Sequence, residues 1–116
     1  MVAGKYSIDF TGKILFLEEL GFETSPELAS NFLYYMKQNG VFDKVKGIWA
    51  GNYTHESGIK LEQILLDVIG EEFKGPIIKS ENFGHIETKT VIPIGATAQI
   101  DTNGIVKIKL LQDCVN

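Results

Sequence analysis

A glutamate and a histidine of this sequence have the character of an acid–base pair, although they lie far apart in the chain. Glu18 directly follows the apolar segment of residues 13–17, and His85 follows Gly84 in a loop. In hydrolytic triads a carboxylate holds the tautomer of an imidazole, which then takes a proton from a hydroxyl or thiol. The sequence offers a carboxylate and an imidazole of this kind, and the nucleophile has to be sought separately.

The carboxylate of such a pair is either Glu18 or Glu19, which stand side by side. Loops at the carboxyl ends of buried parallel strands are where α/β folds place ligand chemistry. Both glutamates are equally consistent with solvated charges that mark the exit of a strand. Side chains alternate along a strand, so one of the two points inward and the other away, but periodicity does not say which.

The two histidines differ in what surrounds them. His85 has the backbone freedom of Gly84 beside it and the access of a loop, which suit a general base. The alternative is a surface histidine that packs against a hairpin. His55 is flanked by Thr54, Glu56 and Ser57. Because triad members converge from distant parts of a chain, we interpret this crowded set as a polar loop tip.

A nucleophile or a metal site is not evident. No serine occupies the G-x-S-x-G turn of a nucleophile elbow, and Ser25 is better explained as a helix cap. Cys114 lies almost at the end of the sequence, where a reactive thiol would have little support. Two histidines and one cysteine, widely spaced, form no recognisable ligand set, so we expect neither a metal nor a cofactor.

Composition predicts one ordinary domain spanning residues 1–116. The net charge of −4 comes from 11 basic and 15 acidic side chains, without a basic patch for nucleic acid. No apolar run reaches the roughly 18 residues of a membrane span. The first residues lack the apolar stretch of a secretory signal, so we expect a cytoplasmic protein and no membrane partner.

A helix is expected to follow the first strand. Either Ser25 caps it with Pro26 at the first helical position, or Thr24 caps it with Glu27 three residues on. Gly40 should end it, since glycine tolerates the left-handed position after a helix. Apolar residues at helical spacing form its predicted buried stripe: Leu28, Ala29, Phe32, Leu33 and Met36.

Strands are expected on both sides of that helix. Residues 13–17 and 45–51 are apolar on both faces, as in the covered strands of a parallel sheet, and a second helix over residues 61–69 leads to a short strand at 76–79. Further strands are predicted at residues 89–94, 97–101 and 105–111. The last two are joined through Asn103-Gly104, a tight-hairpin signal. The expected fold is α/β: a mostly parallel sheet flanked by two main helices, plus a C-terminal antiparallel β layer.

Four segments in this order resemble a known family. They are Gly12-Lys13-Ile14-Leu15-Phe16-Leu17-Glu18-Glu19, residues 39–48, Phe83-Gly84-His85 and Val91-Ile92-Pro93-Ile94-Gly95-Ala96. Together they are similar to the C-terminal domain of the LD-carboxypeptidase family of serine peptidases, and most of all to the branch with the microcin C immunity proteins. The resemblance runs over residues 5–111.

The resemblance implies a swivelling-type β/β/α domain from a two-domain peptidase. In that family the N-terminal domain carries the nucleophilic serine and the oxyanion donors. The family's glutamate falls on Glu18 and its histidine on His85. The serine has no counterpart in this sequence, so the N-terminal serine-bearing domain is the implied partner and hydrolysis by the chain alone is not expected.

The resemblance also implies a substrate class and an assembly. The family hydrolyses an amide bond in a murein peptide or in a peptidyl-nucleotide antibiotic, without a metal, and its full-length members are expected to be homodimers. The alternative is a non-catalytic module for ligand binding or protein interaction. In that case Trp49, Tyr53 and His55 would contact the ligand, and Glu18 and His85 need not approach each other.

Overall fold

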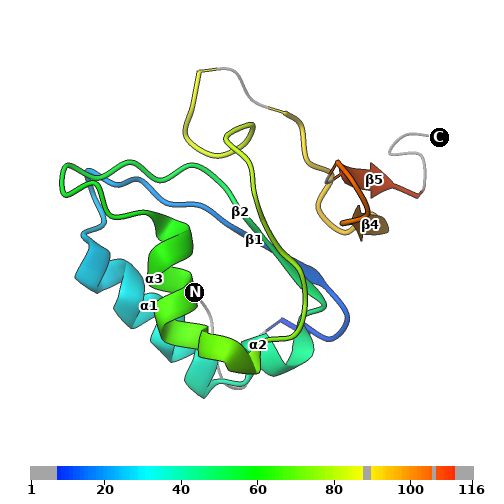
Figure 1. The fold of residues 1–116 in the computed structure, drawn as a ribbon, viewed down its shortest axis with the longest axis horizontal. Coiled ribbons are helices and arrows are strands. Elements are labelled where there is room, and N and C mark those ends of the chain that lie inside the picture. The colour runs from blue at the N-terminus through cyan, green and yellow to red at the C-terminus, as the bar shows by residue number, and fades with distance from the viewer. Residues whose placement is uncertain (1–7, 88–89, 106, 112–116) are drawn as a thin grey trace.

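The computed structural model describes residues 8–87, 90–105 and 107–111 of an α/β fold (Figure 1). Its three-stranded sheet is parallel, with the order β1 (Ile14–Leu17), β2 (Gly47–Ala50), β3 (Ile77–Lys79). A second, antiparallel sheet is formed by β4 (Ala98–Asp101) and β5 (Lys107–Leu110). The predicted fold class, with a parallel sheet and a C-terminal antiparallel layer, is confirmed.

The helices are α1 (Pro26–Gln38), α2 (Val41–Lys44) and α3 (Leu61–Ile69), and the 3-10 turn Gly70–Glu72 continues α3. Of the two predicted caps for α1, Ser25 is the one used: its hydroxyl oxygen accepts a hydrogen bond from the amide of Leu28 at 3.3 Å. Gly40 follows the helix in the left-handed region, with φ of 69°. The short helix α2, which begins directly after Gly40, was not predicted.

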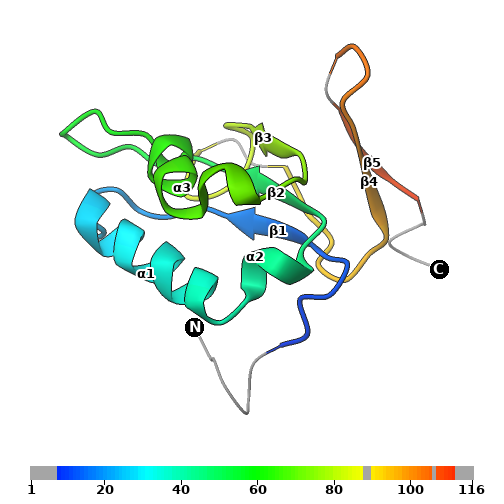
Figure 2. The same cartoon turned by 60° about the horizontal axis from the view of Figure 1, so that its bottom comes forward.

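The main core lies between the helices and one face of the parallel sheet (Figure 2). Leu15 and Leu17 of β1 pack against this core, and Ile48 of β2 is fully buried in it. The buried residues of the two long helices are Pro26, Ala29, Leu33 and Met36 in α1 and Leu61, Ile64, Leu65 and Ile69 in α3. The predicted stripe of α1 was therefore too wide, because Leu28 is 40% exposed and Phe32 51% exposed.

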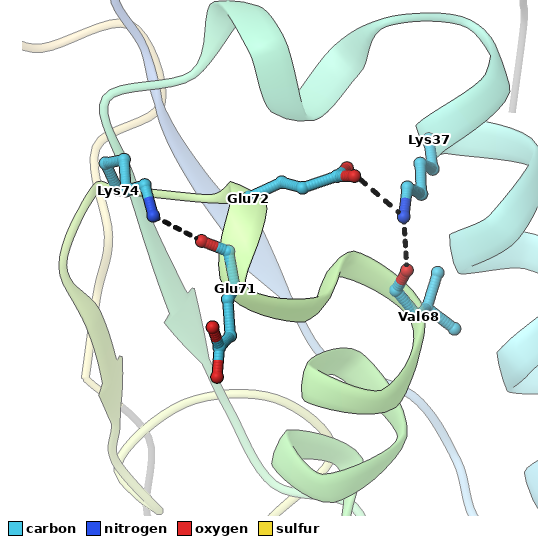
Figure 3. A network of polar contacts seen from close by, with 5 residues as sticks. All are labelled: Lys37, Val68, Glu71, Glu72 and Lys74. Carbon is cyan, nitrogen blue, oxygen red and sulfur yellow. Dashed lines mark hydrogen bonds and ion pairs between the residues drawn. The ribbon is translucent and has the colours of Figure 1, made fainter.

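A lysine of α1 ties the two long helices together at the end of α3 (Figure 3). Lys37 Nζ donates a hydrogen bond to the carbonyl of Val68 at 2.9 Å and lies 3.5 Å from the carboxylate of Glu72. The last carbonyls of a helix have no partner within the helix, and the negative end of its dipole favours a cation. Lys37 therefore stabilises the end of α3 while it holds α1 beside it.

The antiparallel hairpin contacts the parallel sheet near the start of β2, through Ile100. A Cβ built on Gly47 would lie 2.8 Å from Cδ1 of Ile100, so β4 approaches the backbone of β2 closely. Gly47 alternates with Ile48, which faces the helices, and Ile100 therefore packs on the other side. The predicted hairpin is confirmed, but the tight Asn-Gly turn is not: the pairing ends at Asp101 and Lys107, and Gly104 has φ of 79° while Asn103 has no positive φ.

The strand predicted at residues 89–94 was wrong in the part that can be assessed. Residue 89 lies outside the described residues, and residues 90–94 adopt no strand. Val91 and Ile94 are 90% and 84% exposed, and none of the strands that the structure describes pairs with this apolar segment. Pro93 also lacks the N–H that a sheet ladder requires.

Candidate active site

Glu18 continues the alternation of β1 beyond the end of the strand. Leu15 and Leu17 point to the helices, so Phe16 and Glu18 belong to the opposite face. There the Phe16 ring packs against Trp49 of β2, with ring centroids 5.0 Å apart. Glu18 thus emerges at the carboxyl end of the parallel sheet, on the face that carries an aromatic cluster.

The loop after β3 reaches the same place because an aromatic side chain anchors it. Phe83 is 6% exposed, and its ring lies edge-on to Trp49 and to Phe16, with centroids at 5.0 and 5.6 Å. A Cβ built on Gly51 would lie 2.6 Å from this ring, so only glycine leaves room for it directly after β2. Phe83 therefore positions the two residues that follow it over the end of β1.

Gly84 provides the close approach to Glu18. Its φ of 101° lies in a region that side chains rarely adopt, and a Cβ built there would be 2.8 Å from Oε2 of Glu18. The backbone of the loop consequently passes directly over the carboxylate. His85, the next residue, can then turn its ring onto that carboxylate.

The structure brings Glu18 and His85 together. His85 Nδ1 lies 2.8 Å from Glu18 Oε2, and the histidine side chain is 55% exposed while that of the glutamate is 28% exposed. An ionised carboxylate only accepts hydrogen bonds, so Nδ1 carries the proton in this contact. The neutral ring then presents the lone pair of Nε2, which is the arrangement required of a general base.

Glu19 is turned elsewhere, which distinguishes the two glutamates. Its Oε1 accepts a hydrogen bond from the amide of Leu20 at 3.0 Å. Only Glu18 contacts the imidazole of His85. The family resemblance had placed the glutamate on Glu18, but periodicity alone could not make this distinction, because it did not reveal which face of the sheet carries the loop with His85.

His55 organises its own loop instead of forming a second acid–base site. Its Nδ1 lies 2.8 Å from the hydroxyl of Ser57, whose backbone amide also donates to this nitrogen at 3.2 Å. The His55 ring stacks on Tyr53, with centroids 6.4 Å apart. Neither contact involves a carboxylate, in agreement with the interpretation of residues 52–58 as a polar loop.

Two of the residues considered as ligand contacts are engaged in packing. Tyr53 is 3% exposed, and its hydroxyl donates a hydrogen bond to the carbonyl of Thr24 at 2.9 Å. Burial raises the pKa of Tyr53, and nearby Glu27 and Glu19 add to this effect. Trp49 lies within the aromatic cluster. Of these three candidates, only Tyr53 is buried, and Trp49 and His55 are both half-buried.

The part of the chain that the structure describes supplies no hydroxyl to the pair. Within residues 8–87, 90–105 and 107–111, the hydrogen-bonding partner of the His85 ring is Glu18. Ser25 caps α1, and Ser80 accepts a hydrogen bond from the amide of Asn82. In the same ranges no group of three or more histidine, cysteine, aspartate or glutamate side chains could hold a metal ion. Cys114 lies outside the described residues.

Sequence reasoning missed the parts that hold the pair in place. The Phe83 ring packs against Gly51, and the backbone at Gly84 packs against Glu18. Both are contacts between segments that lie far apart in the chain. The spacing of Phe83-Gly84-His85 was the available signal, because an apolar residue and a glycine directly precede the histidine. Nothing in the sequence identified Gly51 as the surface on which that ring would rest.

These features define an α/β domain with a carboxylate–histidine pair at the carboxyl end of its parallel sheet. Residues 1–100 match the family described as the LD-carboxypeptidase C-terminal domain. The chain belongs to this family, as its sequence motifs predicted.

Two similar proteins are about three times as long as the matched region. A probable murein peptide carboxypeptidase of Bacillus subtilis (strain 168) is 29% identical over 103 residues, which cover 84% of this chain and 31% of that protein. The crystal structure of a muramoyltetrapeptide carboxypeptidase from Oxalobacter formigenes has the same fold, with a TM-score of 0.66 and 21% identity over 84% of this chain and 34% of that one. The chain thus spans about a third of the length of each relative. Within its described residues, no helix is long and apolar enough to cross a membrane.

Proposed function

We propose that this domain supplies the acid and the base of a Ser-Glu-His triad that hydrolyses an amide bond in murein peptides. The observation that carries the proposal is the 2.8 Å contact between His85 Nδ1 and Glu18 Oε2. The names of both relatives, one a murein peptide carboxypeptidase and the other a muramoyltetrapeptide carboxypeptidase, support the substrate class. Neither name refers to antibiotic immunity, so we put murein peptides before peptidyl-nucleotides.

The residues of the pair have separate roles in the proposed reaction. Glu18 holds the His85 ring with its proton on Nδ1 and stabilises the imidazolium that forms during turnover. His85 Nε2 takes the proton of a serine hydroxyl as the serine oxygen attacks the scissile carbonyl carbon. The same nitrogen then returns the proton to the departing amine, and an acyl-enzyme remains. Water, deprotonated by His85, finally cleaves the ester and releases the acid.

The serine has to come from outside these 116 residues. A serine-bearing domain, which corresponds to the unmatched part of the relatives, is the partner that we propose. The His85 ring is 55% exposed, so its Nε2 side is accessible to such a domain. No metal or cofactor enters the proposed mechanism.

Reconstitution tests the proposal. The chain is mixed with the serine-bearing portion of the Bacillus subtilis relative, and release of the C-terminal amino acid from a murein tetrapeptide is measured. The mixture should hydrolyse the peptide, whereas either component alone should not. His85→Ala should lower the rate by about 10³–10⁴-fold and Glu18→Gln by about 10²–10⁴-fold. His55→Ala is the matched control and should leave the rate unchanged.

Two results would contradict the proposal. Hydrolysis by the 116-residue chain alone that persists after His85→Ala would mean that the chemistry lies elsewhere. An active mixture in which Glu18→Gln and His85→Ala behave like His55→Ala would mean that the pair serves only to fold the loop.

A further inference from the structure

A groove runs beside Glu18, and His85 is not among the residues that line it. Its volume is about 430 Å³, within the roughly 300–1,000 Å³ typical of ligand pockets. Residues 16–19 form one wall. The other lining residues come from α1 and the start of α3: Ala29, Phe32, Leu33, Tyr35, Met36 and Leu61. The proposed triad uses none of the residues on the helical side.

The groove reaches the edge of β1 at the end of this strand. Successive side chains of a strand point to opposite faces, so a cavity that touches both Phe16 and Leu17 reaches the strand's edge. β1 is an outer strand of the described sheet. The carbonyls of Lys13 and Leu17 accept hydrogen bonds from the amides of Lys46 and Gly51, which flank β2, at 2.8 and 2.7 Å. Since the polar groups of a strand alternate in direction, the N–H and C=O of Phe16 point away from β2, and no described strand pairs with them.

The lining has one charged end and one apolar wall. Phe32 and Tyr35 are 51% and 49% exposed, so their rings offer contact surface without being part of the core. Glu19 is only partly exposed, and among the described residues no lysine, arginine or histidine forms an ion pair with it. A partly buried carboxylate without a cation favours an occupant that brings a positive charge.

We propose that this groove binds an extended peptide, which pairs as an added strand with the outer edge of β1 and places an ammonium group at Glu19. Free strand edges recognise peptides through main-chain hydrogen bonds, while neighbouring pockets accept alternate side chains. The inference deepens the proposed function, on which it rests, by assigning part of the substrate to a site. Because Glu18 both lines the groove and contacts His85, a peptide in the groove would run close to the proposed acid–base pair.

A titration of the ¹⁵N-labelled chain tests the site without any nucleophile. The probe is an N-terminally acetylated tetrapeptide, Ala-Ala-Lys-D-Ala, and its counterpart has the lysine amine acetylated as well. Binding should shift the amide signals of residues 16–19 and slow hydrogen exchange at the Phe16 amide. Phe32→Ala should lower the affinity for both peptides by about fivefold. Glu19→Gln should lower only the affinity for the peptide with the free lysine amine, by about threefold.

Matched controls separate the groove from the general surface. Tyr34→Ala removes a ring that is 54% exposed on the same helix but does not line the groove. Glu23→Gln removes an acid outside it. Neither should change either affinity. Equal responses to Tyr34→Ala and Phe32→Ala, or equal loss for both peptides after Glu19→Gln, would overturn the assignment.

The two proposals fail in different ways. If reconstituted hydrolysis depends on His85 but neither its KM nor peptide binding responds to Phe32→Ala, the groove assignment is wrong and the triad stands. If the peptide binds the groove but no His85-dependent hydrolysis occurs, the triad is wrong. Signals of residues 16–19 that respond to the serine-bearing domain and not to peptide would identify the groove as a domain interface, and would also overturn the assignment.

Discussion

Replacing Gly84 with alanine should separate the acid from the base while both remain in the protein. The new Cβ would lie 2.8 Å from Glu18 Oε2 and 3.3 Å from Glu18 Cβ, so the carboxylate has to move. A flexible carboxylate moves at little cost to folding, but it cannot move without leaving His85. The φ of 101° adds backbone strain.

Two contributions set the expected loss of stability. Strain at a positive φ, after the offset from lost chain entropy in the unfolded state, costs about 1 kcal/mol, and the exposed hydrogen bond between Glu18 and His85 is worth at most about 1 kcal/mol, which together give about 1–2 kcal/mol. Gly58→Ala is the matched control, because Gly58 has φ of 74° but nothing within 4 Å of its Cβ. It should cost about 1 kcal/mol, since lost chain entropy in the unfolded state offsets part of the strain.

The decisive readout is the His85 ring. Urea unfolding measures both stabilities, and the ¹⁵N chemical shifts of the imidazole report which nitrogen carries the proton. The Nδ1–H form should dominate in the unmodified chain and after Gly58→Ala, and should lose its dominance after Gly84→Ala. In the reconstituted enzyme the rate should fall by about 10²-fold, as expected for a misplaced base. An unchanged tautomer after Gly84→Ala would refute this reasoning.

Three further perturbations address the surrounding loops. Gly21→Ala places a Cβ 1.8 Å from a backbone carbonyl oxygen of the loop after β2, so it should cost about 3 kcal/mol in urea unfolding. Tyr53→Phe removes the hydrogen bond to Thr24 and leaves that carbonyl unpaired, so the unfolding free energy should fall by about 1–2 kcal/mol. Hydrogen bonds from its own amide and from Ser25 hold the pKa of Glu27 below its usual 4.5. The associated stability should be present above pH 4.5 and lost as the pH falls through the lower, folded-state pKa, and Glu27→Gln should remove this part of the acid sensitivity in a pH series of melts.

The sequence predicted the local elements well because their signals are local. Pro26 at a helix start and Gly40 after its end each impose a backbone geometry that neighbours hardly alter. Asn103-Gly104 located the hairpin correctly, although the connection is longer than a tight Asn-Gly turn. The segment 89–94 failed because strand pairing depends on a partner, and periodicity alone does not supply one. Its Val91 and Ile94 are exposed in the structure.

Helical spacing alone also could not predict how many residues of α1 are buried. Leu28 and Phe32 have the spacing of core residues, but α3 covers only one flank of the helix. Phe32 consequently lines the groove beside β1 instead of the core. A sequence shows which residues could be buried together, and the number of neighbouring elements decides how many are.

The sequence predicted which residues form the candidate site, but it did not predict the contacts that hold them in place. Glu18 and His85 were identified by residue type and by the family motifs, and the structure brings them into contact. The choice between Glu18 and Glu19 depended on which sheet face the distant loop covers. Once Phe83 is placed on the Phe16 face, strand alternation selects Glu18.

Phe83 stands two residues before His85, so the position of the imidazole depends on how tightly the aromatic cluster of Phe16, Trp49 and Phe83 is packed. The loop cannot drift without withdrawing a ring that is 6% exposed from its seat on Gly51, which costs about 1.5–3 kcal/mol. Any loosening of that aromatic stack would thus reach the ring of His85 before the helical core opens. Slow conformational exchange of the His85 side chain should therefore be the first detectable sign that packing has loosened on the sheet face opposite the helices.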